Sequence, residues 1–281
     1  MINRLEPGDY QKVRSQFRPL DYQLIIRAVI EGTSPGVIYV DDVEVPRSAL
    51  LCSAEGCFLA GDETSSVFNR ALRDLLVEQF FAAKTSRQAD EAISSAFNLA
   101  QVFTVHPDGW ISRFPVIFEG RRPLKVPRKH YTCSEVRIDW RARIPRGYSI
   151  QRIDRGFLSR EGMDVPSHIP SWMKANWGSI DAFMDRGFGF GMIHDRAVVS
   201  WSLADCVSGT EGEIGIRTRE DYRRKGLATL TAASTVDHAF SRGLTKVGWH
   251  TDEENTASIR VAEKVGFTET RDYVSHVVSV R

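Results

Sequence analysis

The sequence lacks an excess of charge of either sign. Among its 281 residues, 37 Lys and Arg residues stand against 36 Asp and Glu residues, for a formal net charge of +1. A nucleic-acid-binding protein normally carries a surplus of Lys and Arg, so we expect no nucleic-acid partner. No apolar run approaches the roughly 18 residues that a membrane helix needs. The first residues also lack the apolar core of a signal peptide. These absences predict a cytoplasmic protein with no membrane partner.

Cysteine is scarce as well. The four cysteines are Cys52, Cys57, Cys133 and Cys206. No two of them form a C-x-x-C pair, and no histidine lies near them at the spacing of a zinc site. The sequence therefore predicts four reduced, structural thiols and no bound metal.

Length and composition indicate a folded protein with two domains. Hydrophobic residues make up 42% and charged residues 26% of the chain, which is typical of globular proteins, and the length corresponds to about two domains. Residues 119–147 are basic and contain Pro123, Pro127 and Pro145. We place the boundary near residues 144–148 and expect domains 1–145 and 146–281. The positive charges of this segment predict a solvated surface, with an anion site as the alternative.

Hydrophobic periodicity predicts a mixed sheet with helices in the second half. The expected strands are 148–153, 188–194, 197–204, 213–218, 247–251 and 273–280, and the expected helices are 170–186, 227–240 and 258–265. This order is typical of an α/β or α+β fold with helices on the faces of the sheet. In the first half we expect a smaller α/β domain, with strands at 37–40, 49–52, 57–60, 102–106 and 131–138 and a helix over 67–83. Residues 102–120 and 246–267 share a layout that predicts a degenerate repeat.

Residues 213–229, EIGIRTREDYRRKGLAT, carry the clearest chemical signal. A strand ends at Thr218, and a charged turn leads directly into a helix. The N-terminus of a helix presents free backbone N–H groups and a partial positive charge, which favour a phosphate. Gly226 lets the backbone approach an anion closely. The segment therefore predicts a pyrophosphate site, although the Walker and G-x-G-x-x-G motifs are both absent. The alternative is a basic turn that only begins a helix.

A second motif, N-x-x-S followed by E-K-x-G-F, lies at residues 255–267. Together with R-x-x-G-x-A at residues 223–228, it resembles the GNAT superfamily of acyl-CoA-dependent N-acetyltransferases over residues 148–281. The segments EIGIRT, YRRKGLAT and AEKVGF, together with Trp249, also resemble the subgroup that contains zwittermicin-type resistance acetyltransferases. Members of that subgroup carry an additional N-terminal domain.

The resemblance implies a GNAT-type sheet, acetyl-CoA as cosubstrate and a set of coenzyme contacts. The strand at 214–218 would diverge from the strand near 247–251, and the pantetheine arm would lie between them. The implied contacts are Ile216, Arg217 and Thr218 for pantetheine, and Arg223, Arg224, Lys225, Gly226, Leu227, Ala228 and Thr229 for the pyrophosphate. Asn255 and Ser258 would contact the far end of the pantetheine or the departing thiolate. The other reading of Asn255 is a cap for the following helix.

Acyl transfer to an amine needs a base for the ammonium and a proton for the leaving thiolate. We expect Glu213 to be the base, with His250 second, because His250 titrates in the right range. The alternative for both is an exposed residue at the end of a strand. Many family members place a general-acid Tyr where this sequence has Ala262. Tyr273, Ser258 or water would then serve as the acid, or the thiolate leaves unassisted.

These inferences predict an N-acetyltransferase that moves an acetyl group to the primary amine of a small molecule by direct attack in a ternary complex. The acceptor pocket would involve residues 172–183, residues 188–190 and the surface between the domains. The alternative for Trp172, Trp177 and Phe183 is a stripe of core residues. We expect a monomer or a homodimer. One alternative is a non-catalytic acyl-CoA-binding or regulatory protein, which the absent tyrosine favours. Another is an acyl or aminoacyl transferase acting on a macromolecule, which the balanced charge disfavours.

Overall fold

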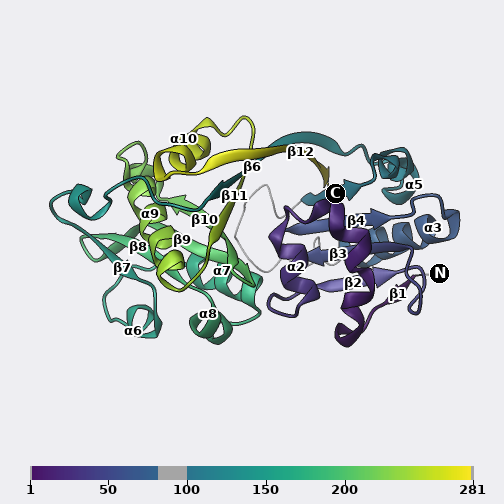
Figure 1. Cartoon of the computed structure of the whole chain (residues 1–281), viewed down its shortest axis with the longest axis horizontal. Helices are drawn as coiled ribbons and strands as arrows, with labels where there is room; N and C mark the ends of the chain where they lie inside the picture. The colour runs from purple at the N-terminus through teal and green to yellow at the C-terminus, as the bar shows by residue number, and fades with distance from the viewer. Residues whose placement is uncertain (1, 82–99, 280–281) are drawn as a thin grey trace. The chain divides into compact units, whose positions relative to one another are not determined.

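The computed structural model describes residues 2–81 and 100–279 (Figure 1). Contacts divide the chain into an N-terminal unit, Met1–Gly32, Gly36–Pro127 and Val274–Arg281, and a C-terminal unit, Thr33–Pro35 and Arg128–Tyr273. The division after Pro127 comes earlier than the predicted boundary near residues 144–148. The reason is that Arg128–Cys133 pairs as a strand inside the C-terminal unit. Among the described residues, no helix is long and apolar enough to cross a membrane.

The C-terminal unit is built on a mixed sheet, as the sequence predicts. Its strands lie in the order β6-β11-β10-β9-β8-β7. Neighbours are antiparallel except for the parallel pair β10 and β11. The strands are β6 (Leu124–Cys133), β7 (Tyr148–Arg152), β8 (Gly189–His194), β9 (Ala197–Ser208), β10 (Glu211–Thr218), β11 (Lys246–Asp252) and β12 (Thr268–Ser279). The helices are α6 (Arg155–Leu158), α7 (His168–Trp177), α8 (Ile180–Arg186), α9 (Leu227–Ser241) and α10 (Thr256–Val265), with short 3-10 turns at η6 (Arg141–Arg143) and η7 (Glu220–Tyr222).

Two predicted elements of this unit differ in the structure. The single helix expected over 170–186 is two helices, because Gly178 adopts a left-handed conformation with φ 81° and ends α7. Ser179 then begins α8 by accepting a hydrogen bond from the backbone N–H of Ala182. The strand expected over 131–138 runs instead from Leu124 to Cys133. Its paired residues begin directly after Pro127, which has no N–H to contribute to a ladder.

The N-terminal unit is a second α/β layer with its own core. Its strands β1 (Asn3–Arg4), β2 (Val37–Val40), β3 (Ser48–Ser53), β4 (Gly56–Gly61) and β5 (Ala100–His106) follow one another in the sheet, and the end of β12 pairs with β5. Its helical segments are η1 (Pro7–Val13), α1 (Arg14–Phe17), η2 (Arg18–Leu20), α2 (Leu24–Ile30), α3 (Ser66–Asp74), η3 (Leu75–Phe81), η5 (Asp108–Arg113) and α5 (Phe114–Ile117). The helix expected over 67–83 corresponds to α3 and the π-helical η3, and its last two residues lie outside the described part. The helical segments between Pro7 and Ile30 were not anticipated by the sequence patterns.

The prediction of four reduced cysteines is wrong for one pair. Cys52 and Cys57 form a disulfide, with 4.2 Å between their Cα atoms. They are direct partners in the hairpin of β3 and β4, so strand pairing alone brings the two thiols together. Cys133 and Cys206 are buried and are not in a disulfide, as the sequence predicts for structural thiols.

The two units repeat one order of elements. Each has an antiparallel hairpin, a helix, a strand parallel to the second hairpin strand, and another helical segment: β3, β4, α3, β5 and η5–α5 in one, β9, β10, α9, β11 and α10 in the other. In each unit the parallel strand then receives an antiparallel neighbour, β12 beside β5 and β6 beside β11. This shared order supports the degenerate repeat, which stays a prediction.

Candidate active site

The parallel strands β10 and β11 part after three residue pairs. Their pairing runs from Glu211 and Lys246 to Glu213 and Gly248 and ends there. At the same place β9 carries a bulge, because Glu213 pairs with Cys206 but Ile214 pairs with Ala204. Within the part of the chain that the structure describes, no strand pairs with the β11-facing edge of β10 beyond Glu213. The predicted divergence of residues 214–218 from β11 is therefore present.

Three predicted catalytic residues meet where these strands part. Oε1 of Glu213 lies 3.1 Å from Nε2 of His250, and Nδ1 of His250 lies 3.0 Å from the hydroxyl of Tyr273. With Glu213 ionised and His250 neutral, Nε2 donates to the carboxylate, which only accepts hydrogen bonds, and Nδ1 accepts from the Tyr273 phenol. The residues form a continuous hydrogen-bonded chain, which we call the Glu213–His250–Tyr273 relay.

Glu213 is buried, with 5% of its surface exposed. A Cβ atom at Gly248 would lie 2.9 Å from the Cγ atom of Glu213, so the glycine on the partner strand leaves room for the carboxylate side chain. The thiol of Cys206 donates to its other oxygen at 3.7 Å. The alternative of an exposed strand-end residue is therefore wrong for Glu213, and the side chain of His250 is also mostly covered, at 14% exposed.

His130 completes the cluster and was not singled out in the sequence. Its ring stacks on that of His250 at a centroid distance of 4.4 Å and an interplanar angle of 18°. Its Nδ1 atom lies 3.0 Å from the hydroxyl of Thr270. Burial and, to a smaller extent, the nearby His250 lower the pKa of His130 to about 4. Only the pairing of β6 with β11, which places His130 opposite His250, could have revealed it.

The cluster is also a metal-ligand set by residue type, since atoms of His130, Glu213 and His250 lie within 4.8 Å of one another. A single ion needs the in-plane lone pairs of its histidine ligands to converge on it. The two rings are stacked 18° from parallel, so their lone pairs run side by side. The observed geometry favours a proton path over a metal centre.

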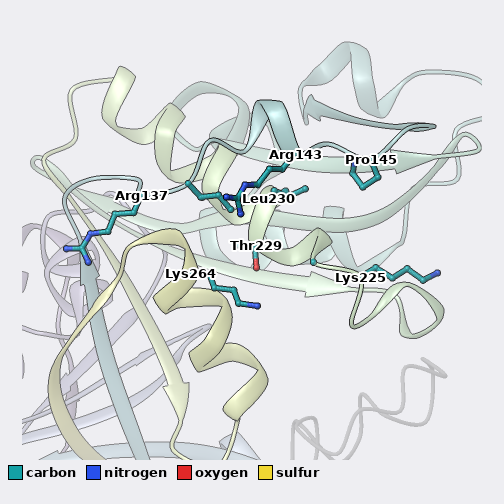
Figure 2. Close-up of a pocket in the computed structure, with 9 residues that line it drawn as sticks. Arg137, Arg143, Pro145, Lys225, Thr229, Leu230 and Lys264 are labelled. Carbon is teal, nitrogen blue, oxygen red and sulfur yellow. The ribbon is translucent and has the colours of Figure 1, made fainter.

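A cationic pocket opens at the start of α9 (Figure 2). Its volume is about 390 Å³. Gly226 precedes the helix in a left-handed conformation with φ 77°. Nine residues line the pocket: Arg137, Ile138, Arg143, Pro145, Lys225, Gly226, Thr229, Leu230 and Lys264. Four of them are cations, and the pocket also includes the first turn of a 15-residue helix. This combination suits a ligand with several phosphate oxygens.

Comparison with known proteins identifies the family. A family model described as GNAT acetyltransferase matches residues 14–276. The chain belongs to this family. Its members are acyltransferases, so the protein is an acyltransferase enzyme. An uncharacterized N-acetyltransferase of Bacillus subtilis, YdfB, is 24% identical over 275 residues, which cover 97% of each chain.

Solved structures share the fold over the whole chain. A GCN5-related N-acetyltransferase-like protein from Streptococcus suis has a TM-score of 0.68 at 24% identity, covering 96% of this chain and 98% of its own. A tandem GNAT protein from the clavulanic acid biosynthesis pathway has a TM-score of 0.51 at 12% identity, covering 100% of this chain and 99% of its own. These likenesses agree with a GNAT fold in a two-domain arrangement.

The cationic pocket contains only part of the predicted set of phosphate-binding residues. Lys225, Gly226 and Thr229 line it. Arg223 instead lies 3.9 Å from Glu220 on the surface, and Leu227 packs into a core cluster with Met192 and Val199. The remaining predicted contacts with phosphate or pantetheine, namely Ile216, Arg217, Thr218, Arg224 and Ala228, stay predictions.

The pocket also contains three cationic residues that the sequence did not predict as site residues. Arg137 and Arg143 come from the basic segment before β7, and Lys264 comes from the end of α10 (Figure 2). The structure thus favours the anion-site alternative for that segment over a purely solvated surface. The available signal was the density of Arg and Lys between residues 119 and 147.

Asn255 and Ser258 have defined local partners. Oδ1 of Asn255 accepts from the backbone N–H of Ser258 at 3.1 Å, so Asn255 caps α10, which confirms one of its two readings. The hydroxyl of Ser258 accepts from Nε1 of Trp249 at 3.0 Å. Their contact with pantetheine stays a prediction.

The aromatic residues expected around the acceptor separate into two groups. Trp177 and Phe183 are buried in the core of the unit, as the alternative of a core stripe predicts, and Phe188 is buried with them. Trp172 is half-buried and lies against Gly215 of β10, where a Cβ would come within 2.1 Å of its ring. Its Nε1 atom donates to Asp205 at 2.5 Å.

Proposed function

We propose that this GNAT acyltransferase moves the acetyl group of acetyl-CoA to the primary amine of a small molecule, by direct attack in a ternary complex. The observation that carries the proposal is the Glu213–His250–Tyr273 relay at the point where β10 and β11 part. The relay lies beside the edge of β10 that is unpaired beyond Glu213, along which we propose that the pantetheine arm binds. An acyl-CoA-binding protein without catalysis has no need of such a relay.

The charges of the C-terminal unit support coenzyme A as the donor's carrier. Coenzyme A has a pyrophosphate and a further phosphate, and the pocket at α9 offers four cationic side chains with a helix N-terminus. Arg143, Lys225 and Lys264 would neutralise the phosphates, and the backbone after Gly226 would donate hydrogen bonds. The pantetheine would then follow the unpaired edge of β10 from Thr218 towards Glu213.

The relay can serve as base and then as acid. When a neutral amine attacks the thioester carbonyl, the new ammonium gives a proton to the Tyr273 oxygen while the phenol proton moves to Nδ1 of His250. The buried carboxylate of Glu213 stabilises the resulting imidazolium. As the carbon–sulfur bond breaks, Tyr273 gives its proton to the thiolate and regains one from His250. The products are an amide and the free thiol, and Glu213 assists His250 as the base by stabilising its protonated form.

The region around Trp172 supports an amine acceptor. Asp205 is 9% exposed, and it lies on the β9 bulge beside Trp172. A carboxylate next to an aromatic ring attracts an ammonium group. We propose that this pair orients the acceptor ammonium, which releases its first proton to solvent water before the neutral amine attacks.

Release of free thiol from acetyl-CoA across a panel of small amines tests the proposed function, with calorimetry of coenzyme A in parallel. We expect coenzyme binding in the micromolar range or tighter and amine-dependent thiol release. An absence of coenzyme binding would overturn the proposal. Tight binding with no turnover on any amine would favour the non-catalytic alternative.

A further inference from the structure

A second cavity lies entirely within the N-terminal unit. It has a volume of about 530 Å³ and is lined by Thr64, Ser66, Asn69, Arg70, Arg73, Arg113, Pro115, Val116 and Glu119. These residues lie on α3 and just before it, on η5 and α5, and just after α5. The volume falls within the range of sites that hold small molecules. We call this cavity the α3 pocket.

The α3 pocket is cationic. It contains Arg70, Arg73 and Arg113 and a single carboxylate, Glu119. Arg73 already pairs with Asp74, and Glu119 lies 3.7 Å from Arg121. Arg70 is exposed at the mouth, and Arg113 lies across the pocket on a different segment. Two guanidinium groups from separate elements therefore remain to attract an anion.

Two buried polar atoms of the lining have no partner among the described residues. Asn69 is 4% exposed. Its Nδ2 atom donates to the carbonyl of Glu63 at 2.9 Å, which fixes the orientation of the amide. Its Oδ1 atom and the Nε atom of Arg113 are both buried without a hydrogen bond. Buried polar atoms are nearly always satisfied, so such a pair requires an explanation. A ligand that both accepts and donates would satisfy them together.

The α3 pocket also occupies the place in its unit that the cationic pocket occupies in the other. Each pocket is lined by the helix that follows the hairpin, α3 or α9, and by a helical segment that follows the parallel strand, η5–α5 or α10. The turns differ, however. Residues 62–65 before α3 include Asp62 and Glu63 and no glycine, and Ser65 caps the helix by accepting from the N–H of Phe68 at 3.2 Å. This turn gives no close backbone approach for a pyrophosphate, so a smaller anion is favoured.

We propose that the α3 pocket is a binding site for a small oxyanion that also carries a hydroxyl donor, either a phosphate monoester or a hydroxycarboxylate. Arg113 and Arg70 bind the anionic group, with Nε of Arg113 as one donor. The hydroxyl of the ligand donates to Oδ1 of Asn69. Val116 and Pro115 contact the remaining apolar part of the ligand. The site is independent of acyl transfer in the C-terminal unit.

Isothermal titration of the full chain with inorganic phosphate and, separately, with lactate tests this site. We expect saturable binding of at least one of the two. Binding of phosphate alone indicates a phosphate monoester, and binding of lactate alone indicates a hydroxycarboxylate. Since a hydrogen bond to a charged group contributes about 1.5–3 kcal/mol, Arg113→Gln should weaken that binding by about ten- to a hundredfold.

Three further variants locate the binding. Arg70→Gln changes an exposed side chain, so it should fold normally and also weaken binding. Arg47→Gln changes an exposed arginine of the same unit outside the pocket and should have no effect. Lys225→Gln removes a cation from the other pocket and should also leave this binding intact. Absence of saturable binding, or affinities in Arg113→Gln and Arg70→Gln equal to that of the unaltered chain, would overturn the proposal.

Discussion

Glu213 and His250 lie 3.1 Å apart, on two parallel strands that stop pairing at Glu213 itself. His250 is two residues beyond the strand partner of Glu213, so both side chains project from the same face of the sheet. The carboxylate is buried and the imidazole nearly so. The point at which the strands stop pairing therefore fixes the position of Glu213 and His250.

Glu213→Gln should reduce kcat by about a hundredfold or more, because an amide cannot stabilise the His250 imidazolium as a carboxylate does. Coenzyme affinity should stay unchanged, since Glu213 does not line the cationic pocket. Steady-state kinetics with calorimetry of coenzyme A measures both. Glu211→Gln is the matched control, because Glu211 lies on the same strand in a surface ion pair with Lys246 at 2.7 Å. An unchanged kcat in Glu213→Gln would contradict the relay.

Tyr273→Phe should lower kcat by at least about tenfold, because it removes the hydroxyl that both takes and returns the proton. Residues that act as one unit give non-additive losses. The double variant with Glu213→Gln should thus lose little more than the worse single variant. The kcat values of the two single variants and the double variant test this coupling. Fully additive losses in log kcat would show that Tyr273 does not act through the relay.

Gly226→Val should abolish coenzyme binding while leaving the chain folded. No protein atom lies within 4 Å of a Cβ at Gly226, so the new side chain would fill the pocket without a clash in the protein. Gly243→Val is the control. Gly243 follows the other end of α9, has φ +90° and is equally open, so it carries the same backbone strain away from the pocket. Calorimetry should show loss of binding in the first variant alone, and equal losses would assign the effect to strain.

Arg143→Gln should weaken coenzyme A binding by about tenfold, because a charge-assisted hydrogen bond to phosphate is lost. The loss should shrink at high salt, where the phosphates are screened. Arg141→Gln serves as control, since Arg141 lies two residues away in an exposed pair with Asp237 at 2.9 Å. Titrations at two salt concentrations measure this. Equal affinities for the two variants would remove Arg143 from the phosphate site.

His130 should make folding sensitive to acid. Its pKa is lowered to about 4 from 6.5, mainly by burial. Between these values the unfolded chain binds a proton that the folded chain does not, so stability falls as the pH drops from about 6.5 to about 4 and then levels off. The shift corresponds to about 3 kcal/mol. Urea unfolding at several pH values should show a smaller loss in His130→Phe than in the unaltered chain. Some loss remains in the variant, because burial lowers the pKa values of His168, His238 and His276 in both chains. Parallel profiles would contradict the lowered pKa.

Several features of this protein could be predicted from short stretches of sequence, because local interactions produce them. The strand, charged turn and helix around Gly226 depend on residues adjacent in the chain, and β10, α9, β11 and α10 all lie where periodicity predicts them. The cap formed by Asn255 is likewise local. Glu213 and His250 could be named as candidates because their strands carry the family motif.

Other features required contacts between residues far apart in the sequence. His130 joins the cluster only because β6 pairs with β11, more than a hundred residues later. The disulfide depends on the register of β3 and β4, which cannot be predicted from the spacing of the cysteines. The bonds that link Glu213 to His250 and His250 to Tyr273 depend on the packing of three strands. The sequence by itself determined the family, the helix N-terminus at Gly226 and the candidate residues, because these are local. The tertiary structure decided which candidates are buried and hydrogen-bonded to one another, because burial and strand register arise only when distant segments pair.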